Sequence, residues 1–479
     1  MKKLFALIVF SVSLILFFNA CEDRSELTAP PSLNGVSGEA NLTKMVSLGN
    51  SLTAGYQNGT LYISATQYAY PYLIAKQADV EMSGIAVSDP GLGGRLEIKS
   101  LSPFTLFTNT KTGSILNSTY PKPFQNLGVP GALAYDVLQA TSSTNCASAL
   151  FGGTPNPFFD IILRNGTTGT KTPIQLALEQ NPSLITLWIG NNDVLGYATS
   201  GGVSPSAPTP VANFQAIFNG IADAISTAGK QGKGVVANIP NVTSIPFFTT
   251  VGPQIALSTP WQQLRAAGVM GLVYQKASGV GLADSASLLM GTNLVTLRGS
   301  SYAPLLGQAT AKYYRDLGIA VPAGIDTSKP FGFHPQNPWP NALILDTDEI
   351  QIATNAVNSF NTIIANFANT VNFGLVDINK LFKDIRQNDF TGGTVFNGRV
   401  FTTTFVTGGL FSLDGVHPSS QGQGIIANEF IKVINSKFNA KFPLVNVSAI
   451  PGSLIFSGKI SYQNGYPIIP IEAFNNLLF

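Results

Sequence analysis

Cysteine and histidine are scarce in this chain of 479 residues, which contains two of each. The cysteines, Cys21 and Cys146, are too few for the disulfide framework on which many small secreted domains depend. Two histidines and one internal cysteine also cannot make a His/Cys zinc site. We therefore expect no metal or other cofactor, and a catalytic histidine would have to be His334 or His417.

Charge is scarce as well, because only 11% of the residues are Asp, Glu, Lys or Arg. The 27 basic and 25 acidic residues almost cancel. Proteins that bind nucleic acid carry an excess of basic residues, which neutralise the phosphates. The composition therefore predicts no nucleic-acid partner.

A long apolar run occurs at the N-terminus, where residues 4–18 follow Lys2 and Lys3. This pattern is typical of a secretory signal, and the run is shorter than the roughly 20 residues of a membrane span. Ala20 followed by Cys21 resembles the bacterial lipobox, which implies that Cys21 becomes a lipidated N-terminus. Ordinary cleavage beside an incidental cysteine is the alternative. We expect residues 1–20 to be the signal peptide, residues 21–43 a tether, and residues 44–479 one large domain.

Short apolar segments bounded by turn residues predict buried parallel strands at residues 45–48, 184–189, 235–239 and 374–376. Apolar residues at helical spacing predict helices at residues 173–180, 347–368 and 420–435. This alternation predicts an α/β fold, a three-layer α/β/α sandwich around a mostly parallel sheet. Segments at about 90–125, 140–170, 198–211 and 285–340 show neither period, and we expect them to be long loop insertions.

Polar residues that could take part in catalysis follow two of the predicted strands, in Gly49-Asn50-Ser51 and in Gly190-Asn191-Asn192-Asp193. Ligands of parallel sheets bind at this end of the strands. Asp414 and His417 lie three residues apart, so the carboxylate can accept from one imidazole nitrogen while the other takes a proton from a serine. Helix capping by the serine and by the histidine is the structural alternative. His334 has no acid at a useful spacing, and we interpret it as structural or pocket-lining.

Four short blocks together resemble the SGNH/GDSL hydrolase superfamily, and they occur in that family's order. They are SLGNSLTAG at residues 47–55, NLGVPGALAYDVL at 126–138, IGNND at 189–193, and DGVHPSSQGQGIIANEF at 414–430. The resemblance extends to a bacterial lipoprotein branch of the superfamily. It implies a flavodoxin-like SGNH hydrolase fold for residues 44–479.

The resemblance also implies a role for each matching residue. Ser51 is expected to be the nucleophile, His417 the general base, and Asp414 the residue that orients the imidazole. The oxyanion hole is expected to consist of the Ser51 N–H, the Gly131 N–H and the Asn192 side-chain amide. Such preorganised donors each contribute about 10²–10³ in rate.

Some positions depart from the family's pattern or leave a choice open. Asn50 stands where the family usually has Asp, and an amide donates as well as accepts hydrogen bonds. Gly128 is a rival to Gly131, because the GVPG segment offers two glycines. Trp188 is expected in the core.

The segment that contains Ile245, Phe247 and Phe248 follows a predicted strand. It could line an acyl pocket or simply pack in the core. The sequence alone does not separate these two interpretations.

These observations predict a serine ester hydrolase of the GDSL esterase/lipase type, which cleaves carboxylic esters of small molecules or lipids through an acyl-enzyme. The alternatives are a carbohydrate O-acetylesterase and a non-catalytic, glycan-binding surface lipoprotein. Terminal Phe479 is also found in outer-membrane barrels, but the helical segments contradict a barrel. We expect a monomer in the bacterial cell envelope, held by its lipid at the outer membrane.

Overall fold

The computed structural model describes residues 36–454, except residues 102–103, 122, 166–168, 204–206, 267, 277–278 and 453. The predicted signal peptide, Cys21 and most of the predicted tether lie outside the described residues. Their assignment therefore stays a prediction.

A five-stranded parallel sheet forms the centre of the domain, with the strand order β11-β6-β5-β1-β4. Its strands are β1 (Met45–Gly49), β4 (Asn126–Gly128), β5 (Leu184–Trp188), β6 (Gly234–Ala237) and β11 (Gly374–Val376). The sequence predicted all of them except β4. That edge strand has three residues and gives no apolar run to recognise.

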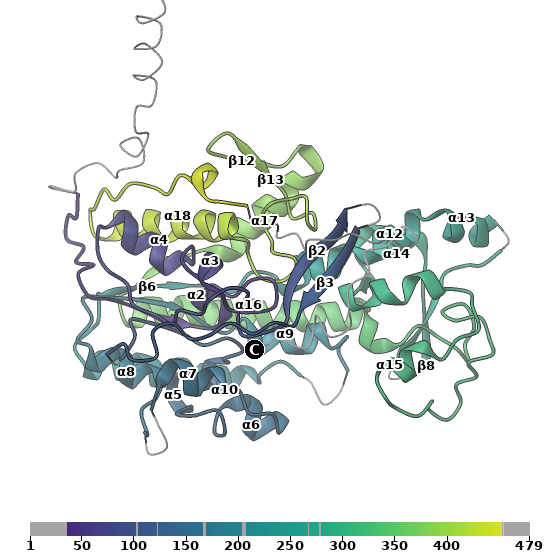
Figure 1. The fold of residues 1–479 in the computed structure, drawn as a ribbon, viewed down its shortest axis with the longest axis horizontal. Helices are drawn as coiled ribbons and strands as arrows, with labels where there is room; N and C mark the ends of the chain where they lie inside the picture. Colours follow the sequence, from purple (N-terminus) through teal and green to yellow (C-terminus); the bar gives the residue numbers. More distant parts are fainter. Residues whose placement is uncertain are drawn as a thin grey trace, which may run out of the picture.

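Helices cover both faces of the sheet, which confirms the predicted three-layer α/β/α architecture (Figure 1). On one face, α4 (Tyr70–Gln77) and α18 (Ser420–Lys437) pack together through the stacked rings of Tyr70 and Phe430, whose centroids are 4.4 Å apart. The Tyr70 ring also contacts Trp188 of β5. Trp188 is fully buried, as predicted.

The other face carries α5 (Ala134–Gln139), α8 (Pro173–Glu179), α10 (Val211–Thr227) and α16 (Thr347–Thr370). Asp346 caps α16, and Glu349 completes a capping box. The Phe214 ring of α10 stacks on the Phe360 ring of α16, with centroids 3.9 Å apart. We did not predict α10, although its buried residues recur at helical spacing.

Three of the four predicted loop insertions contain secondary structure, so the prediction of long structureless loops was wrong there. Residues 90–125 include a hairpin of β2 (Arg95–Leu101) and β3 (Phe104–Asn109). The helices and strands of these three segments are too short to show a clear hydrophobic period in the sequence. The described part of residues 198–211 is a loop between α9 (Asn192–Thr199) and α10.

The other helices and strands are short and lie mostly between β6 and α18. They are α2 (Ser51–Ala54), α3 (Ile63–Thr66), α6 (Ala147–Gly152), α7 (Phe158–Leu163), α11 (Pro246–Thr249), α12 (Val251–Leu257), α13 (Thr259–Ala266), β7 (Leu272–Lys276), β8 (Gly279–Ala283), α14 (Ser285–Met290), β9 (Leu294–Val295), α15 (Lys312–Asp316), β10 (Ile344–Leu345), α17 (Ile378–Asn388), β12 (Thr394–Phe396) and β13 (Arg399–Phe401).

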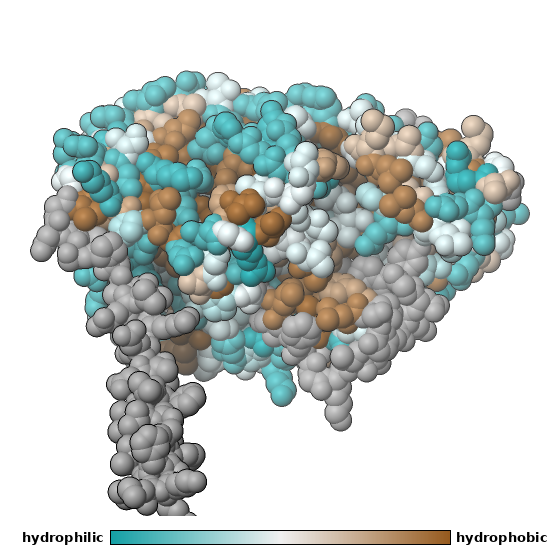
Figure 2. Space-filling view, turned by 90° about the horizontal axis from the view of Figure 1, so that it is seen from above, coloured by the Kyte–Doolittle hydropathy of each residue, from teal (hydrophilic) through white to brown (hydrophobic). Residues whose placement is uncertain are grey.

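The surface of the domain mixes hydrophilic residues with separate hydrophobic patches on the face shown in Figure 2. Within residues 36–454, as far as they are described, no helix has the length and apolar character needed to cross a bilayer.

Candidate active site

Ser51 is the first residue of α2, directly after β1. Gly49, the last residue of the strand, lies between β5 and α2. A Cβ atom there would be 2.5 Å from the Trp188 carbonyl oxygen and 2.1 Å from Thr53 Oγ1. Glycine is therefore required for close packing, and the turn presents Ser51 at the carboxyl end of the sheet.

The structure brings Ser51, Asp414 and His417 together across almost the whole chain. His417 Nε2 lies 2.9 Å from Ser51 Oγ, and His417 Nδ1 lies 3.0 Å from Asp414 Oδ2. The three residues are 4%, 0% and 1% exposed. This arrangement is the hydrogen-bonded serine–histidine–aspartate series that nucleophilic catalysis requires.

Asp414 is held as a charged hydrogen-bond acceptor. Its Oδ1 accepts from the backbone N–H groups of Val416 and His417, and its Oδ2 also accepts from the Gly59 N–H. Burial alone would raise the pKa of the Asp414 carboxyl, but the facing His417 and these hydrogen bonds hold that pKa below its usual value. An ionised Asp414 favours a proton on Nδ1, so Nε2 can accept from Ser51.

Gly131 lies in the turn after β4 with a φ of 78°, which glycine adopts without strain. No acceptor for its N–H is found among the described residues. The rival Gly128 lies inside β4, and its N–H donates to Asn126 Oδ1 at 3.0 Å. Gly131 is therefore the glycine with an N–H available to a substrate.

Hydrogen bonds from distant residues fix the backbone on either side of Gly131. Asn156 Nδ2 donates to the Pro130 carbonyl at 2.8 Å, and Asn192 Nδ2 donates to the Ala132 carbonyl at 2.9 Å. The Asp193 carboxylate accepts from the Ala134 N–H at 2.9 Å. We call residues 129–134 the oxyanion loop. Its backbone is rigidly held around the unpaired Gly131 N–H.

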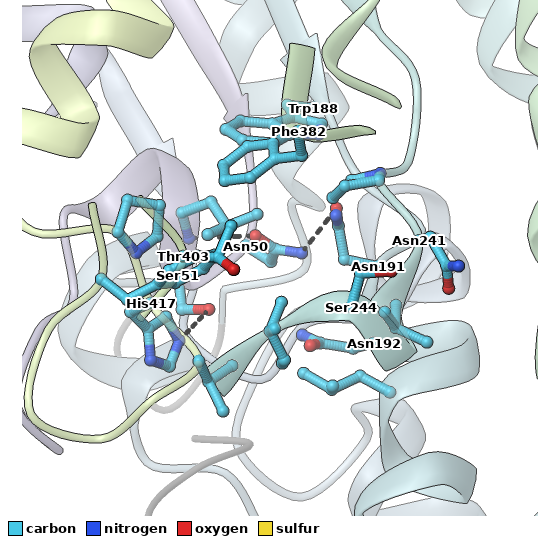
Figure 3. A pocket seen from close by; sticks show the side chains of 18 residues that line it. Asn50, Ser51, Trp188, Asn191, Asn192, Asn241, Ser244, Phe382, Thr403 and His417 are labelled. Carbon is cyan, nitrogen blue, oxygen red and sulfur yellow. Dashed lines mark hydrogen bonds between the residues drawn. The ribbon is translucent and has the colours of Figure 1, made fainter. Parts of the chain in front are cut away.

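Asn192 begins α9 and faces the same cavity as Ser51 (Figure 3). One hydrogen of its amide is used by Ala132, and a second remains on the same nitrogen. Asn192 therefore has a structural contact and can still donate to a bound group.

Residues 45–275 match the family model of the GDSL-like lipase/acylhydrolases. This part of the chain is therefore similar to the GDSL-like lipase/acylhydrolase family. The match includes Ser51, Gly131 and Asn192, while Asp414 and His417 lie beyond it. A comparison with curated proteins found no match. Similarity to this family suggests an ester hydrolase.

Asn50, the departure from the usual GDSL pattern, makes the two kinds of hydrogen bond that an amide permits. Its Oδ1 accepts from the Leu52 N–H at 3.0 Å and caps α2. Its Nδ2 donates to Asn191 Oδ1 at 3.4 Å, as Figure 3 shows. Ser51 therefore sits in a turn braced by neutral side chains.

The pocket beside Ser51 and His417 is narrow, with a cavity volume of about 50 Å³. Its walls come mainly from the segments after β1, β5 and β6 and from the segment between β13 and α18, and α17 adds Phe382. Apolar lining residues include Leu52, Trp188, Leu195, Val242, Ile245 and Phe382. Apart from His417 no titratable side chain of the described residues lines it.

Only part of the segment that contains Ile245, Phe247 and Phe248 lines the pocket. Ile245 lines the pocket, whereas Phe247 and Phe248 are fully buried and pack against each other. His334 lies in a turn, where its Nδ1 accepts from the Gln336 N–H at 3.1 Å, and it does not line the pocket. No cluster of His, Cys, Asp and Glu that could hold a metal occurs in the described residues.

Sequence reasoning missed the segment that supports Asp414 and His417. The Tyr56 ring packs against the His417 imidazole, with centroids 4.9 Å apart. Asn58 has a φ of 52° and its Oδ1 accepts from the Leu413 N–H at 2.8 Å. The Asn58-Gly59 pair was a visible turn signal, but nothing in the sequence indicated which segment that turn would contact.

Proposed function

We propose that this chain is a serine hydrolase of carboxylic esters with Ser51, His417 and Asp414 as its catalytic triad. The observation that carries the proposal is the distance of 2.9 Å between Ser51 Oγ and His417 Nε2, with Asp414 on the other imidazole nitrogen. A serine becomes a nucleophile when an oriented base can take its proton.

In the proposed reaction, Ser51 Oγ attacks the ester carbonyl carbon while His417 Nε2 accepts the hydroxyl proton. The carbonyl oxygen becomes an oxyanion that the Ser51 N–H, the Gly131 N–H and the Asn192 amide stabilise. The bond to the alcohol then breaks, and His417 returns its proton to the leaving oxygen. Water repeats these steps on the acyl-enzyme, which releases the acid and regenerates Ser51.

The lining of the pocket supports an uncharged acyl group. Its apolar walls would bury hydrocarbon, and they offer no charged side chain to pair with a charged acyl group. The small cavity favours a short acyl chain over a long one.

The test uses Ser51→Ala with Ser436→Ala as the matched control on the exposed face of α18. We expect Ser51→Ala to fold normally, to lose turnover of 4-nitrophenyl acetate, and to resist labelling by an organophosphate. Ser436→Ala should retain both activity and labelling. Full activity of folded Ser51→Ala would refute the proposal.

We also propose that residues 1–20 are removed and that a lipid on Cys21 anchors residues 44–479 to the bacterial outer membrane through a tether. The support is the sequence pattern around Ala20 and Cys21. Labelled palmitate should enter the wild type and Cys146→Ser, but not Cys21→Ser. Unlabelled wild type in the soluble fraction would contradict the anchor.

A further inference from the structure

A second cavity of about 460 Å³ lies beyond the narrow catalytic pocket. We call it the outer compartment. Its lining residues are Leu101, Phe104, Thr249, Thr250, Gln254, Arg386, Thr404, Phe405, Val406 and Thr407. They come from the end of β2 and the start of β3, from α11 and α12, from α17, and from the loop after β13.

Three chain segments run from the catalytic pocket into the outer compartment. On α17, Phe382 lines the first cavity and Arg386, one turn later, lines the second. In the second segment, Thr403 lines the catalytic pocket and Thr404 lines the outer compartment. The third segment leads from Ile245 to the start of α12. The two cavities therefore lie close to each other, on either side of these segments.

The chemistry of the lining changes from one cavity to the other. Near Ser51 the walls are mostly apolar, whereas hydroxyl, amide and guanidinium groups line the outer compartment. Among the described residues no partner is found for the side chains of Gln254, Thr404 and Thr407. The edge-to-face rings of Phe104 and Phe405, 6.0 Å apart, provide apolar surface beside them. Several available donors and acceptors beside aromatic rings suit a ligand with many hydroxyl groups.

The outer compartment offers no net charge. Of the described residues that line it, Arg386 alone is charged, and its Nη1 lies 3.1 Å from Asp389 Oδ2. The same nitrogen donates to Thr403 Oγ1 at 3.0 Å. An anionic group would therefore meet a guanidinium that is already neutralised, so a neutral polar ligand fits better than a phosphate or a carboxylate.

We propose that the outer compartment binds a neutral, hydroxyl-rich part of the substrate, such as the sugar residues of an acylated oligosaccharide. The inference rests on the proposed ester hydrolysis and adds the substrate class. The ester lies at Ser51 with a short acyl group, and the sugar extends past Phe382 and Thr403. The catalytic residues do not change.

The test compares Gln254→Ala and Thr407→Val with Gln263→Ala, an exposed glutamine of α13 that lines neither cavity. Two substrates are used, 4-nitrophenyl acetate and acetylated xylo-oligosaccharides. Loss of one or two hydrogen bonds should raise KM for the oligosaccharide about 3- to 10-fold. KM for the aryl acetate should stay unchanged in every variant, because this small ester does not reach the outer compartment.

A palmitoyl ester tests whether the outer compartment binds a sugar or a long acyl chain. If Gln254→Ala and Thr407→Val change KM for 4-nitrophenyl palmitate and leave the oligosaccharide unaffected, the outer compartment binds hydrocarbon and the proposal is overturned. Equal KM values for the oligosaccharide in wild type and variants overturn it as well. Failure of the wild type to hydrolyse even 4-nitrophenyl acetate would instead refute the ester hydrolase.

Discussion

At the scale of single residues, the Asp414 carboxylate holds its own turn in place and also orients the His417 imidazole. It accepts from two backbone N–H groups of its own turn and from the imidazole, while also binding the turn at Gly59. The backbone hydrogen bonds hold the carboxylate in place, so the imidazole is oriented before a substrate arrives. This arrangement makes the side chain difficult to replace.

Asp414→Asn should lower kcat by up to about 10⁴, as comparable replacements do in other serine triads. The amide oxygen can keep the contacts with the Val416 and His417 N–H groups. The amide N–H group would face His417 Nδ1 and favour the wrong tautomer, and the contact with the Gly59 N–H would be lost. Turnover of 4-nitrophenyl acetate and melting temperature should be measured together. A folded Asp414→Asn enzyme with normal kcat would remove Asp414 from the triad.

Asn192→Ala should lower kcat and kcat/KM alike by about 10²–10³, with KM nearly unchanged, because an oxyanion donor acts mainly in the transition state. The contact with the Ala132 carbonyl will also be lost, so some decrease in melting temperature is expected. Asn192→Asp should be equally poor, because a carboxylate would face the developing negative charge. An unchanged kcat in Asn192→Ala would exclude it from the oxyanion hole.

At the scale of elements, the oxyanion loop depends on residues far away in the sequence. Asn156, which holds the Pro130 carbonyl, comes from the connection between α6 and α7. Its Oδ1 accepts from the Phe158 N–H at 3.0 Å, so the side chain joins α7 to the loop. A segment predicted as a featureless insertion therefore positions the Gly131 N–H.

Asn156→Asp separates the two contacts of this side chain. The carboxylate can still accept from Phe158, but it cannot donate to the Pro130 carbonyl and would repel it. We expect kcat to fall about 10-fold or more with little change in KM, because Gly131 would lose its alignment. Asn145→Asp provides the control, since Asn145 Oδ1 accepts from Thr141 and Ser142 in a nearby turn without contacting the loop. Parallel losses of kcat in both variants would point to general destabilisation.

Elements with a strong local pattern could be predicted, and those defined by tertiary contacts could not. Four strands of the central sheet, β1, β5, β6 and β11, are short apolar runs, and α16 has a clear apolar stripe with acidic residues at its start. The residues of the proposed triad could be found in the sequence because they occur in recognisable blocks. Strand β4 and the hairpins are too short to show a period. The roles of Asn156 and Asp193 depend on partners 26 and 59 residues away, which no local pattern reveals.

At the scale of the whole molecule, two buried carboxyl groups near the oxyanion loop connect stability with pH. Burial raises the pKa of Asp136 to about 7 and that of Asp193 to about 6. Hydrogen bonds from backbone N–H groups only partly offset the effect. The folded state thus binds protons that the unfolded chain has already released at the same pH.

The free energy of unfolding that Asp136 contributes should decrease as pH rises from about 4, where the unfolded residue ionises, to about 7. Asp136→Asn removes this titration. Its melting temperature should be lower than that of the wild type at about pH 4, since one backbone contact is lost, and the difference should narrow towards neutral pH. A difference in melting temperature between wild type and Asp136→Asn that increases with pH would contradict the raised pKa of Asp136.

Ser51 and His417 are 366 positions apart, and α18 begins just after the histidine. A ribosome therefore synthesises the nucleophile long before the base that activates it. A nascent chain, or any fragment truncated before residue 417, contains the serine turn and the oxyanion loop and still cannot deprotonate Ser51. If the proposed triad is correct, esterase activity therefore requires that translation and folding have reached α18.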